Sequence, residues 1–385
     1  MFTWRGQHGT MATFALATVG YDLNVTANAT TGEVAPFSEF YHTAQFVTGL
    51  ICYPILCALG LVGNTFILIV MSQKSMSTST NVYLSALAVS DIIKLINDVL
   101  YSLTILLLKV SPIAGNRMFG YLYPHAHFVF NMSVCVSSWL TVSVAVERYI
   151  LVCHPTRSVS LITRQRAVTI SVACYVIMTS VAVPSALRYR TVQVAAPDGT
   201  NATWLGVELT ALWHDGAFVL VYNWLQSSLR SIVPLFILVF VNAFIINALR
   251  RTRANKKLAS RNKITVMLIV VIVFFLVCII PDAVMSAFFN LGYVESDNYL
   301  VKGVREVTDM LLAVNAAVNY PLYMIFNKIF RDQFFASFCR APRPGEDKRY
   351  SRVGHANHSR GTNAHAKDNI NCTNVTKNNV KTDSL

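Results

Sequence analysis

Long apolar runs separated by short polar connections fill the chain between residues 43 and 326. A helix needs about 20 apolar residues to cross the hydrocarbon layer of a bilayer. Runs that reach this length predict seven transmembrane helices, over residues 43–71, 80–108, 118–151, 167–187, 223–249, 264–289 and 300–326. The second, third and seventh of these runs carry polar residues and are therefore weaker spans by hydropathy.

This pattern predicts an all-α membrane protein, a bundle of seven transmembrane helices with a short amphipathic helix after the seventh. We expect an extracellular N-terminal segment over residues 1–42 and the helical domain over residues 43–338. The remainder, residues 339–385, is polar and rich in Asn, Lys, His and Arg. Such a composition buries too little apolar surface to fold, so it is expected to be a disordered cytoplasmic tail.

Composition agrees with a membrane protein and adds an orientation. Hydrophobic residues make up 54% of the chain and charged residues 13%, yet the formal net charge is +13. Soluble domains carry about 25% charged residues, which argues against a soluble enzyme, a disordered protein and a nucleic-acid binder. Lys and Arg gather in the third-to-fourth and fifth-to-sixth connections and in the tail. Because cytoplasmic loops carry the basic excess, we expect the N-terminus outside, the C-terminus inside, and a multi-pass protein of the plasma membrane.

Modification sites follow from this orientation. Asn24, Asn28 and Asn201 begin Asn-x-Thr sequons on the outer side, where glycosylation is expected. Cys339 follows the last amphipathic segment, a juxtamembrane position that favours palmitoylation; a free thiol is the alternative. None of the eight cysteines falls in an outer loop, so we expect no disulfide there. The long outer loop over residues 188–222 is then ordered by packing alone or remains mobile.

Polar motifs recur at set places in the spans. They are Gly60-Leu-Val-Gly63-Asn64, Leu87-Ala-Val-Ser90-Asp91, Glu147-Arg148-Tyr149, Phe275-Leu-Val-Cys278-Ile-Ile-Pro281 and Asn315-Ala-Ala-Val-Asn319-Tyr-Pro-Leu-Tyr323. Each motif alone is a weak signal, but all of them in this order on these spans are specific. From about residue 43 to residue 338 the chain resembles the rhodopsin-like (class A) G-protein-coupled receptors.

The resemblance implies an activation switch at the inner ends of the helices. Arg148 would be held by Glu147 at rest and would contact a heterotrimeric G protein when active. Many relatives add a second acid on the sixth helix, where Arg261 stands here, which indicates easier activation. The residues expected to carry the switch are Glu147, Arg148, Tyr149, Phe275, Pro281, Asn319 and Tyr323.

A carboxylate inside a membrane span is costly and marks a functional interior. Asp91 is such a residue, and Ser137, Asn315 and Asn319 would complete an oxygen-lined pocket with it. The resemblance implies an allosteric sodium ion there, favouring the resting state. An interhelical hydrogen-bond network without an ion is the alternative, and no other cofactor is expected.

Departures from the family pattern leave the fold prediction intact but affect the detailed switch. Ile279 stands where a tryptophan is usual on the sixth helix, and Asn242 where a tyrosine is usual on the fifth. Tyr123 stands where the third helix usually carries a bridging cysteine. Phe130 and Ala313 occupy the positions of the amine-binding aspartate and the retinal-binding lysine, so amine and retinal ligands are excluded.

Ionisable residues in the outer halves of the spans are the candidates for ligand recognition, and an excess of acids would suit a cationic ligand such as an arginine-containing peptide. Pairing is the alternative: Lys94 with Asp98, Arg305 with Asp309, and Arg230 with Asp282 across the bundle. Asp282 lacks a local partner and is the sharpest candidate. The expected ligand contacts are Asp98, His127, Phe130, Asn131, Gln226, Arg230, Asp282, Glu306 and Asp309.

The sixth- and seventh-span motifs are similar to those of invertebrate neuropeptide receptors of the FMRFamide type. We therefore expect a receptor for an extracellular peptide that activates a heterotrimeric G protein, with arrestin and membrane lipids as further partners and no nucleic acid. A chemosensory receptor of the same fold for a small molecule is the nearest alternative. A transporter or channel is the further alternative; it would need a continuous polar path, and the sequence offers a cluster around Asp91 but no second acidic ring or internal repeat. An enzyme would need a nucleophile, metal or phosphate motif, and the sequence has none.

Overall fold

The computed structural model describes residues 36–195, 203–252, 259–289 and 298–338, and helices account for nearly all of them. The chain divides into two units, Met1–Ser337 and Phe338–Leu385. The helical bundle described below lies in the first unit.

The helices follow one another with short connections. Wide π-type turns interrupt two of the spans, at Thr48–Cys52 and Ser228–Ile232. The elements of the first three spans and their connections are α2 (Ser38–Val47), η1 (Thr48–Cys52), α3 (Tyr53–Met71), η2 (Lys74–Met76), α4 (Ser79–Val110), α5 (Pro112–Cys153) and α6 (Pro155–Leu161). The remaining elements are α7 (Arg164–Ala186), β1 (Tyr189–Ala195), β2 (Thr203–Leu209), η3 (Ala211–His214), α8 (Gly216–Ser227), η4 (Ser228–Ile232), α9 (Val233–Thr252), α10 (Ala259–Phe289), α11 (Tyr299–Phe326) and α12 (Lys328–Phe338).

The predicted seven-helix bundle is confirmed. Six described helices are long and apolar enough to cross a membrane by length and composition. The seventh span is α4, which has 32 residues and carries the charged residues Asp91, Lys94 and Asp98 along its length. The segment 38–71 begins five residues earlier than predicted, whereas the predicted ends at Met71, Phe289 and Phe326 coincide with the observed ones. Many large apolar side chains, among them Val62 and Phe236, are exposed on the bundle, as lipid-facing residues would be.

Side-chain caps explain several helix starts. Thr78 and Thr163 accept hydrogen bonds from backbone amides at the starts of α4 and α7. Asp215 and Asn298 do the same for α8 and α11. Because the first four amides of a helix lack intrahelical acceptors, these polar residues fix where each helix begins.

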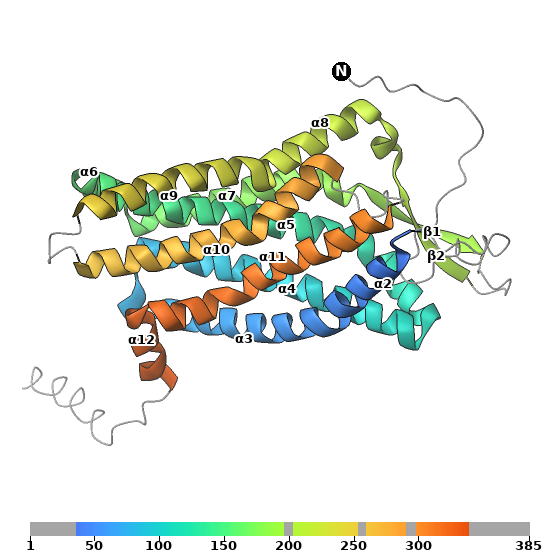
Figure 1. Cartoon of the computed structure of the whole chain (residues 1–385), viewed down its shortest axis with the longest axis horizontal. Coiled ribbons are helices and arrows are strands. Elements are labelled where there is room, and N and C mark those ends of the chain that lie inside the picture. Colours follow the sequence, from blue (N-terminus) through green and yellow to red (C-terminus); the bar gives the residue numbers. More distant parts are fainter. Residues whose placement is uncertain (1–35, 196–202, 253–258, 290–297, 339–385) are drawn as a thin grey trace, which may run out of the picture. The chain divides into compact units, whose positions relative to one another are not determined.

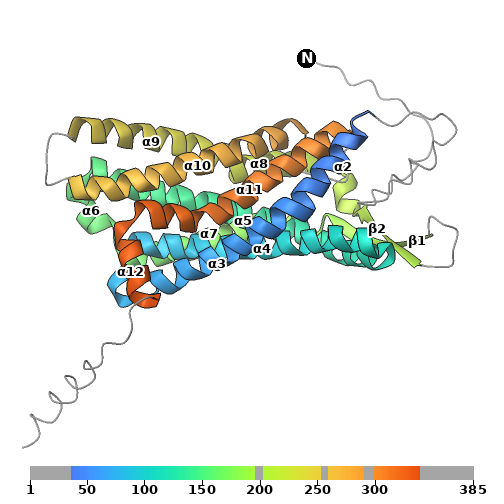
Figure 2. The same ribbon diagram turned by 60° about the horizontal axis from the view of Figure 1, so that its bottom comes forward.

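The helices pack side by side along most of their length. In Figures 1 and 2, α4 lies between α3 and α5, and α11 runs beside both α3 and α10. Close approach of α3 to α11 depends on Gly63, since a Cβ added there would come within 2.7 Å of the Tyr320 Cβ atom.

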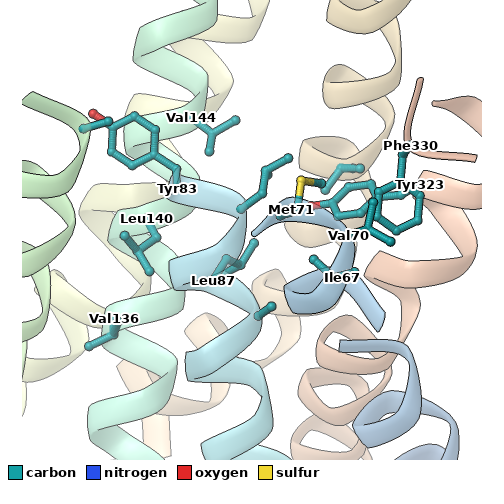
Figure 3. Close-up of a cluster of buried hydrophobic side chains, with 14 of the residues drawn as sticks. Ile67, Val70, Met71, Tyr83, Leu87, Val136, Leu140, Val144, Tyr323 and Phe330 are labelled. Atoms are coloured by element: carbon teal, nitrogen blue, oxygen red, sulfur yellow. The ribbon is translucent and has the colours of Figure 1, made fainter. Parts of the chain in front are cut away.

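The largest apolar cluster lies toward the inner ends of the helices. Figure 3 shows Met71 of α3, Leu140 of α5, Tyr323 of α11 and Phe330 of α12 in this cluster. The Tyr323 and Phe330 rings have centroids 5.8 Å apart, and Phe330 is completely buried. This contact joins α12 to the bundle.

The long outer loop forms an ordered antiparallel hairpin of β1 and β2, with Tyr189 opposite Leu209. Asn116 of α5 fastens it by donating to the Leu205 carbonyl at 2.9 Å and accepting from the Leu205 amide at 2.8 Å. A Cβ at Gly120 would lie 2.6 Å from the Leu205 Cβ atom, so the hairpin rests directly on the helix. Packing therefore orders the described part of this loop, which is the first of the two expected alternatives. The described cysteines are all free.

Candidate functional site

A cavity opens among the outer halves of the helices. Its walls come from α3, α4, α5, η4 and α11 and combine aromatic rings with charged groups. Its volume is about 130 Å³. It is lined by Tyr53, Asn97, Asp98, Tyr101, Phe119, Tyr123, Ala126, His127, Phe130, Asn131, Arg230, Arg305, Glu306 and Asp309.

Helical spacing explains why these residues share one cavity. Asn97, Asp98 and Tyr101 lie on one face of α4, at intervals of three and four residues. Phe119, Tyr123, His127 and Phe130 follow the same spacing along α5. Residues three or four apart lie on the same side of a helix. Sequence reasoning did not place Tyr53, Asn97, Tyr101, Phe119, Tyr123, Ala126 or Arg305 among the ligand contacts, and this spacing was the signal that could have found most of them.

Two of the predicted acidic contacts are engaged in buried ion pairs. Lys94 Nζ lies 2.5 Å from Asp98 Oδ2 within α4. Arg230 Nη2 donates to Asp282 Oδ1 at 2.6 Å, which joins η4 to α10. Asp282 is 2% exposed and does not line the cavity. The structure thus places Asp282 in the internal pair that was the alternative to a ligand contact.

The two acids on α11 differ in their surroundings. Glu306 accepts hydrogen bonds from the Tyr101 hydroxyl at 2.6 Å and the Thr48 hydroxyl at 3.2 Å. Asp309 also lines the cavity, but it makes no hydrogen bond or ion pair anywhere in the described ranges. Pairing of Arg305 with Asp309, the alternative to a ligand contact, is not among the salt bridges of the described residues, although Arg305 acts on Asp309 electrostatically. Asp309 is consequently the acid most open to a ligand.

Seven of the nine predicted ligand contacts line the cavity: Asp98, His127, Phe130, Asn131, Arg230, Glu306 and Asp309. Gln226 does not; it is fully buried in α8, and its amide oxygen and nitrogen find no hydrogen-bond partner among the described residues. Asp282 lies behind Arg230. Both were predicted from their depth in the span, which does not tell which side of the helix faces the cavity.

Deeper in the bundle, polar side chains gather at Asp91, which is 1% exposed. Asn319 of α11 donates to Asp91 Oδ2 at 2.7 Å, and Ser137 of α5 donates to Oδ1 at 3.2 Å. Three of the four residues predicted for the ion pocket therefore meet. Asn315 forms no hydrogen bond with Asp91 in the described part of the chain.

At the inner end of α5, Thr80 of α4 lies between the acid and the base of the Glu147-Arg148 motif. Its hydroxyl donates to Glu147 Oε1 and accepts from Arg148 Nη2. Arg148 Nη2 also lies 3.4 Å from Glu147 Oε1. Both side chains are mostly buried, so the arginine is held inside the bundle. Tyr149 is half-buried and packs edge-on against Phe244 of α9.

The other residues predicted for the switch are interior. Phe275 and Ile279 are buried in one apolar cluster where α5, α9 and α10 meet. Pro281 lies within α10, and Tyr323 is 1% exposed with its hydroxyl unpartnered among described residues. The glycosylation candidates Asn24, Asn28 and Asn201, the palmitoylation candidate Cys339, and the side chain of Arg261 lie outside the described residues.

A bundle of seven membrane helices, open to a cavity at one end and holding a buried arginine at the other, defines a seven-helix receptor. The model of the 7 transmembrane receptor (rhodopsin family) matches residues 63–323. The chain belongs to this family, whose members are receptors and not enzymes, and it is a multi-pass protein of the plasma membrane.

Curated relatives are similar along much of the chain. The FMRFamide receptor of Drosophila melanogaster is 26% identical over 73% of this chain, which spans 52% of that relative. The sex peptide receptor of the same organism is 27% identical over 81% of this chain and 78% of the relative. The cholecystokinin receptor of Xenopus laevis is 23% identical over 77% of each. The chain therefore spans about half of the first relative and about three quarters of the other two.

Proposed function

We propose that this protein is a receptor for an extracellular peptide and that it activates a heterotrimeric G protein. The names of all three relatives refer to peptide ligands. The aromatic and charged walls of the outer cavity support this proposal, because peptides offer both kinds of group. Binding would shift a two-state equilibrium through different affinities for the resting and active forms.

The size of the cavity limits what enters it. A cavity of about 150 Å³ holds a molecule the size of benzene, and this one has about 130 Å³. One or two side chains of a peptide would fit, while the rest of the ligand would lie outside the cavity. The β1–β2 hairpin, which rests on Gly120 and Asn116, offers an ordered surface beside the cavity, because the ring of its Tyr189 lies 5.1 Å from the ring of the lining residue Tyr123.

The observation that carries the ligand proposal is the open carboxylate of Asp309. Three other charged groups of the wall are occupied: Asp98 by Lys94, Arg230 by Asp282, and Glu306 by two hydroxyls. The fourth, Arg305, acts on Asp309 electrostatically but forms no ion pair with it among the described salt bridges. An ion in a low-dielectric site needs a counter-charge. Asp309 would therefore take a cationic group of the ligand, with Tyr53 and Tyr101 lining the same space.

The experiment is a screen of a neuropeptide library against the expressed receptor, followed by Asp309→Asn. We expect the half-maximal concentration of a cationic peptide to rise about tenfold or more, since charged hydrogen bonds are worth about 1.5–3 kcal/mol. A peptide in which the cationic side chain is replaced by a neutral one should lose the difference between wild type and variant.

Asp215→Asn is the matched control, because Asp215 caps α8 and does not line the cavity. An unchanged dose response for Asp309→Asn would remove the cation site. The small cavity also favours a second candidate, a chemosensory receptor for a small molecule. Activation by a small cation and by no peptide of the library would select it.

We also propose that an allosteric sodium ion binds at Asp91. The oxygens of Asp91 and Ser137 fit an alkali ion, but Asn319 now points its amide nitrogen at the carboxylate and would have to turn its oxygen inward. A bound ion would supply positive charge to a buried carboxylate. The residues that would hold the ion are Asp91 of α4, Ser137 of α5 and Asn319 of α11.

We also propose two cytoplasmic partners, the G protein and arrestin. We expect the G protein to bind where Arg148 is released, and arrestin to use the same end of the bundle. Palmitoylation of Cys339 and glycosylation of Asn24, Asn28 and Asn201 would be read by mass spectrometry of the protein from membranes.

A further inference from the structure

Two buried ion pairs share one aromatic ring beside the cavity. Lys94 Nζ lies 5.3 Å from the centroid of the Phe130 ring, and Arg230 Cζ lies 5.1 Å from the same centroid. Lys94 is paired with Asp98 and Arg230 with Asp282. We call these five residues the charge ladder: acid, cation, ring, cation, acid.

The charge ladder is fully enclosed at its charged positions. Lys94 and Asp98 are each 4% exposed, Arg230 is 3% and Asp282 is 2%. Attraction between a cation and a ring strengthens when water is excluded, and so does each ion pair. Removal of one member would leave its partner charged and unpaired in the interior, so the ladder acts as a unit.

The two ion pairs of the charge ladder connect different parts of the bundle. The Lys94–Asp98 pair lies within α4, at a spacing of four residues. The Arg230–Asp282 pair crosses from η4 to α10, and Ser231 supports it by donating to Asp282 Oδ2 at 3.3 Å. Among the salt bridges between described residues, this is the one that attaches α10 to another helix.

A third contact fixes Arg230 from α5. Arg230 Nη1 donates to Asn131 Oδ1 at 2.8 Å, and Asn131 Nδ2 donates to the His127 carbonyl at 2.8 Å. The guanidinium is thus held between α5 and α10. Arg230 belongs to the wide turn η4, which lies between α8 and α9. Its side chain is buried inside the bundle.

Three members of the ladder face the cavity: Asp98, Phe130 and Arg230. Lys94 and Asp282 lie behind them and do not line it. A ligand group that fills the cavity therefore touches the Phe130 ring and the Arg230 guanidinium directly. The guanidinium in turn binds the carboxylate of Asp282, which belongs to α10.

The surroundings of Asp282 along α10 are unequal. Phe275 and Ile279 pack in an apolar cluster with α5 and α9. In the other direction lies Ser286, which is buried and has no hydrogen-bond partner among the described residues. Apolar contacts tolerate small shifts, whereas an ion pair with a distance of 2.6 Å has one defined geometry.

We propose that the Arg230–Asp282 pair is a lock that holds α10 in its resting position, and that the cavity is coupled to the lock through Phe130 and Arg230. Displacement of the ring or recruitment of the guanidinium by the ligand weakens the pair and frees α10. This inference rests on the proposed function, because movement of α10 is read as G-protein activation. The lock would give α10 a way to respond to the ligand although Ile279 stands where this helix usually carries a tryptophan in the family.

The test needs no ligand. Full-length receptor in lipid nanodiscs is mixed with purified G protein, and ligand-free nucleotide exchange is measured for a graded set of variants. Asp282→Asn keeps the shape and removes the charge, and we expect exchange to rise about fivefold, within the usual range of coupling between two sites. Asp282→Glu keeps the pair and should stay close to wild type.

Ser231→Ala provides a milder opening in case Asp282→Asn does not fold. It removes one hydrogen bond to Asp282 Oδ2, and we expect a rise of about twofold, below that of Asp282→Asn. Ser286→Ala is the matched control, since it lies one turn further along α10, equally buried but without a hydrogen bond. We expect no change for it.

Hydrogen–deuterium exchange of the α10 peptides separates failure of the lock from failure of the signalling proposal. One outcome is faster amide exchange in α10 for Asp282→Asn, with no nucleotide exchange by the wild type or any variant. This would support the lock but contradict the proposal that the protein activates a G protein. Unchanged α10 exchange and unchanged nucleotide exchange in a folded Ser231→Ala and Asp282→Asn, or an equal rise in Ser286→Ala, would overturn the lock.

Discussion

The outer and inner halves of the bundle are stabilised by different interactions. The outer half holds charges in pairs around a cavity, as in Lys94–Asp98 and Arg230–Asp282. The inner half is filled by the large cluster that contains Leu140, Tyr323 and Phe330. Apolar packing sums many weak contacts, whereas each buried ion pair depends on one partner, whose loss leaves a charge unpaired in the interior. The comparison indicates that a ligand in the cavity can perturb a few defined charged contacts, whereas the inner helices are held by many apolar contacts at once.

The largest expected effect is at the inner end. Arg148→Ala should reduce ligand-stimulated nucleotide exchange about 100-fold, at the upper end of site-to-site coupling, because Arg148 is the base that Thr80 and Glu147 hold. Surface expression, measured by antibody labelling of intact cells, should stay at the wild-type level. Arg157→Ala, an exposed arginine of α6, is the control. Retained exchange at equal expression would contradict the role of Arg148.

The inner cluster should be the more sensitive to loss of volume. Leu140 is completely buried there, and Leu140→Ala leaves a cavity that costs about 3 kcal/mol. A lowered melting temperature in a thermal-shift assay would record this. Leu108→Ala, in the small outer cluster with Ile105 and Phe119, is the matched comparison, for which a smaller loss is expected. Equal losses would show that the two halves are packed alike.

The outer hairpin tests whether hydrogen bonds replace a covalent bridge. Asn116→Ala removes both bonds to Leu205, with a loss of about 1–3 kcal/mol in the docking of the hairpin. We expect faster amide exchange in β2 and weaker binding of the activating peptide. Mild reductant should leave binding of the wild type intact, since the described cysteines are free. Loss of binding in reductant would contradict this account.

The smallest expected effect concerns sodium. Asp91→Asn should abolish the dependence of peptide affinity on sodium concentration, a change of about fivefold in the wild type at the low end of such couplings. The measurement compares binding in sodium and in N-methylglucamine buffers. Ser90→Ala is a neighbouring control, because Ser90 contacts Ser137 and the Ser133 carbonyl but not Asp91. A wild type insensitive to sodium would leave the hydrogen-bond network as the better description.

Some of this architecture follows from the sequence alone. Runs of apolar residues determined the spans, because the bilayer sets the length that a helix must have. The ends at Met71, Phe289 and Phe326 were predicted to the residue. Motif order identified the family, and the Lys94–Asp98 pair could be read from a spacing of four residues, which places two side chains on the same face of a helix.

Tertiary structure decided what lies between helices. Asp282 is the acid without a local partner in the sequence, yet it is paired, because its partner Arg230 is 52 positions away and reaches it across the bundle. Asp309 has Arg305 at the helical spacing, yet its carboxylate is open to the cavity. The hairpin of the outer loop likewise depends on Asn116, which lies 89 positions from Leu205. Local rules govern contacts along one helix, but the rotation of each helix about its axis sets the others, and that rotation is fixed by packing of the whole bundle.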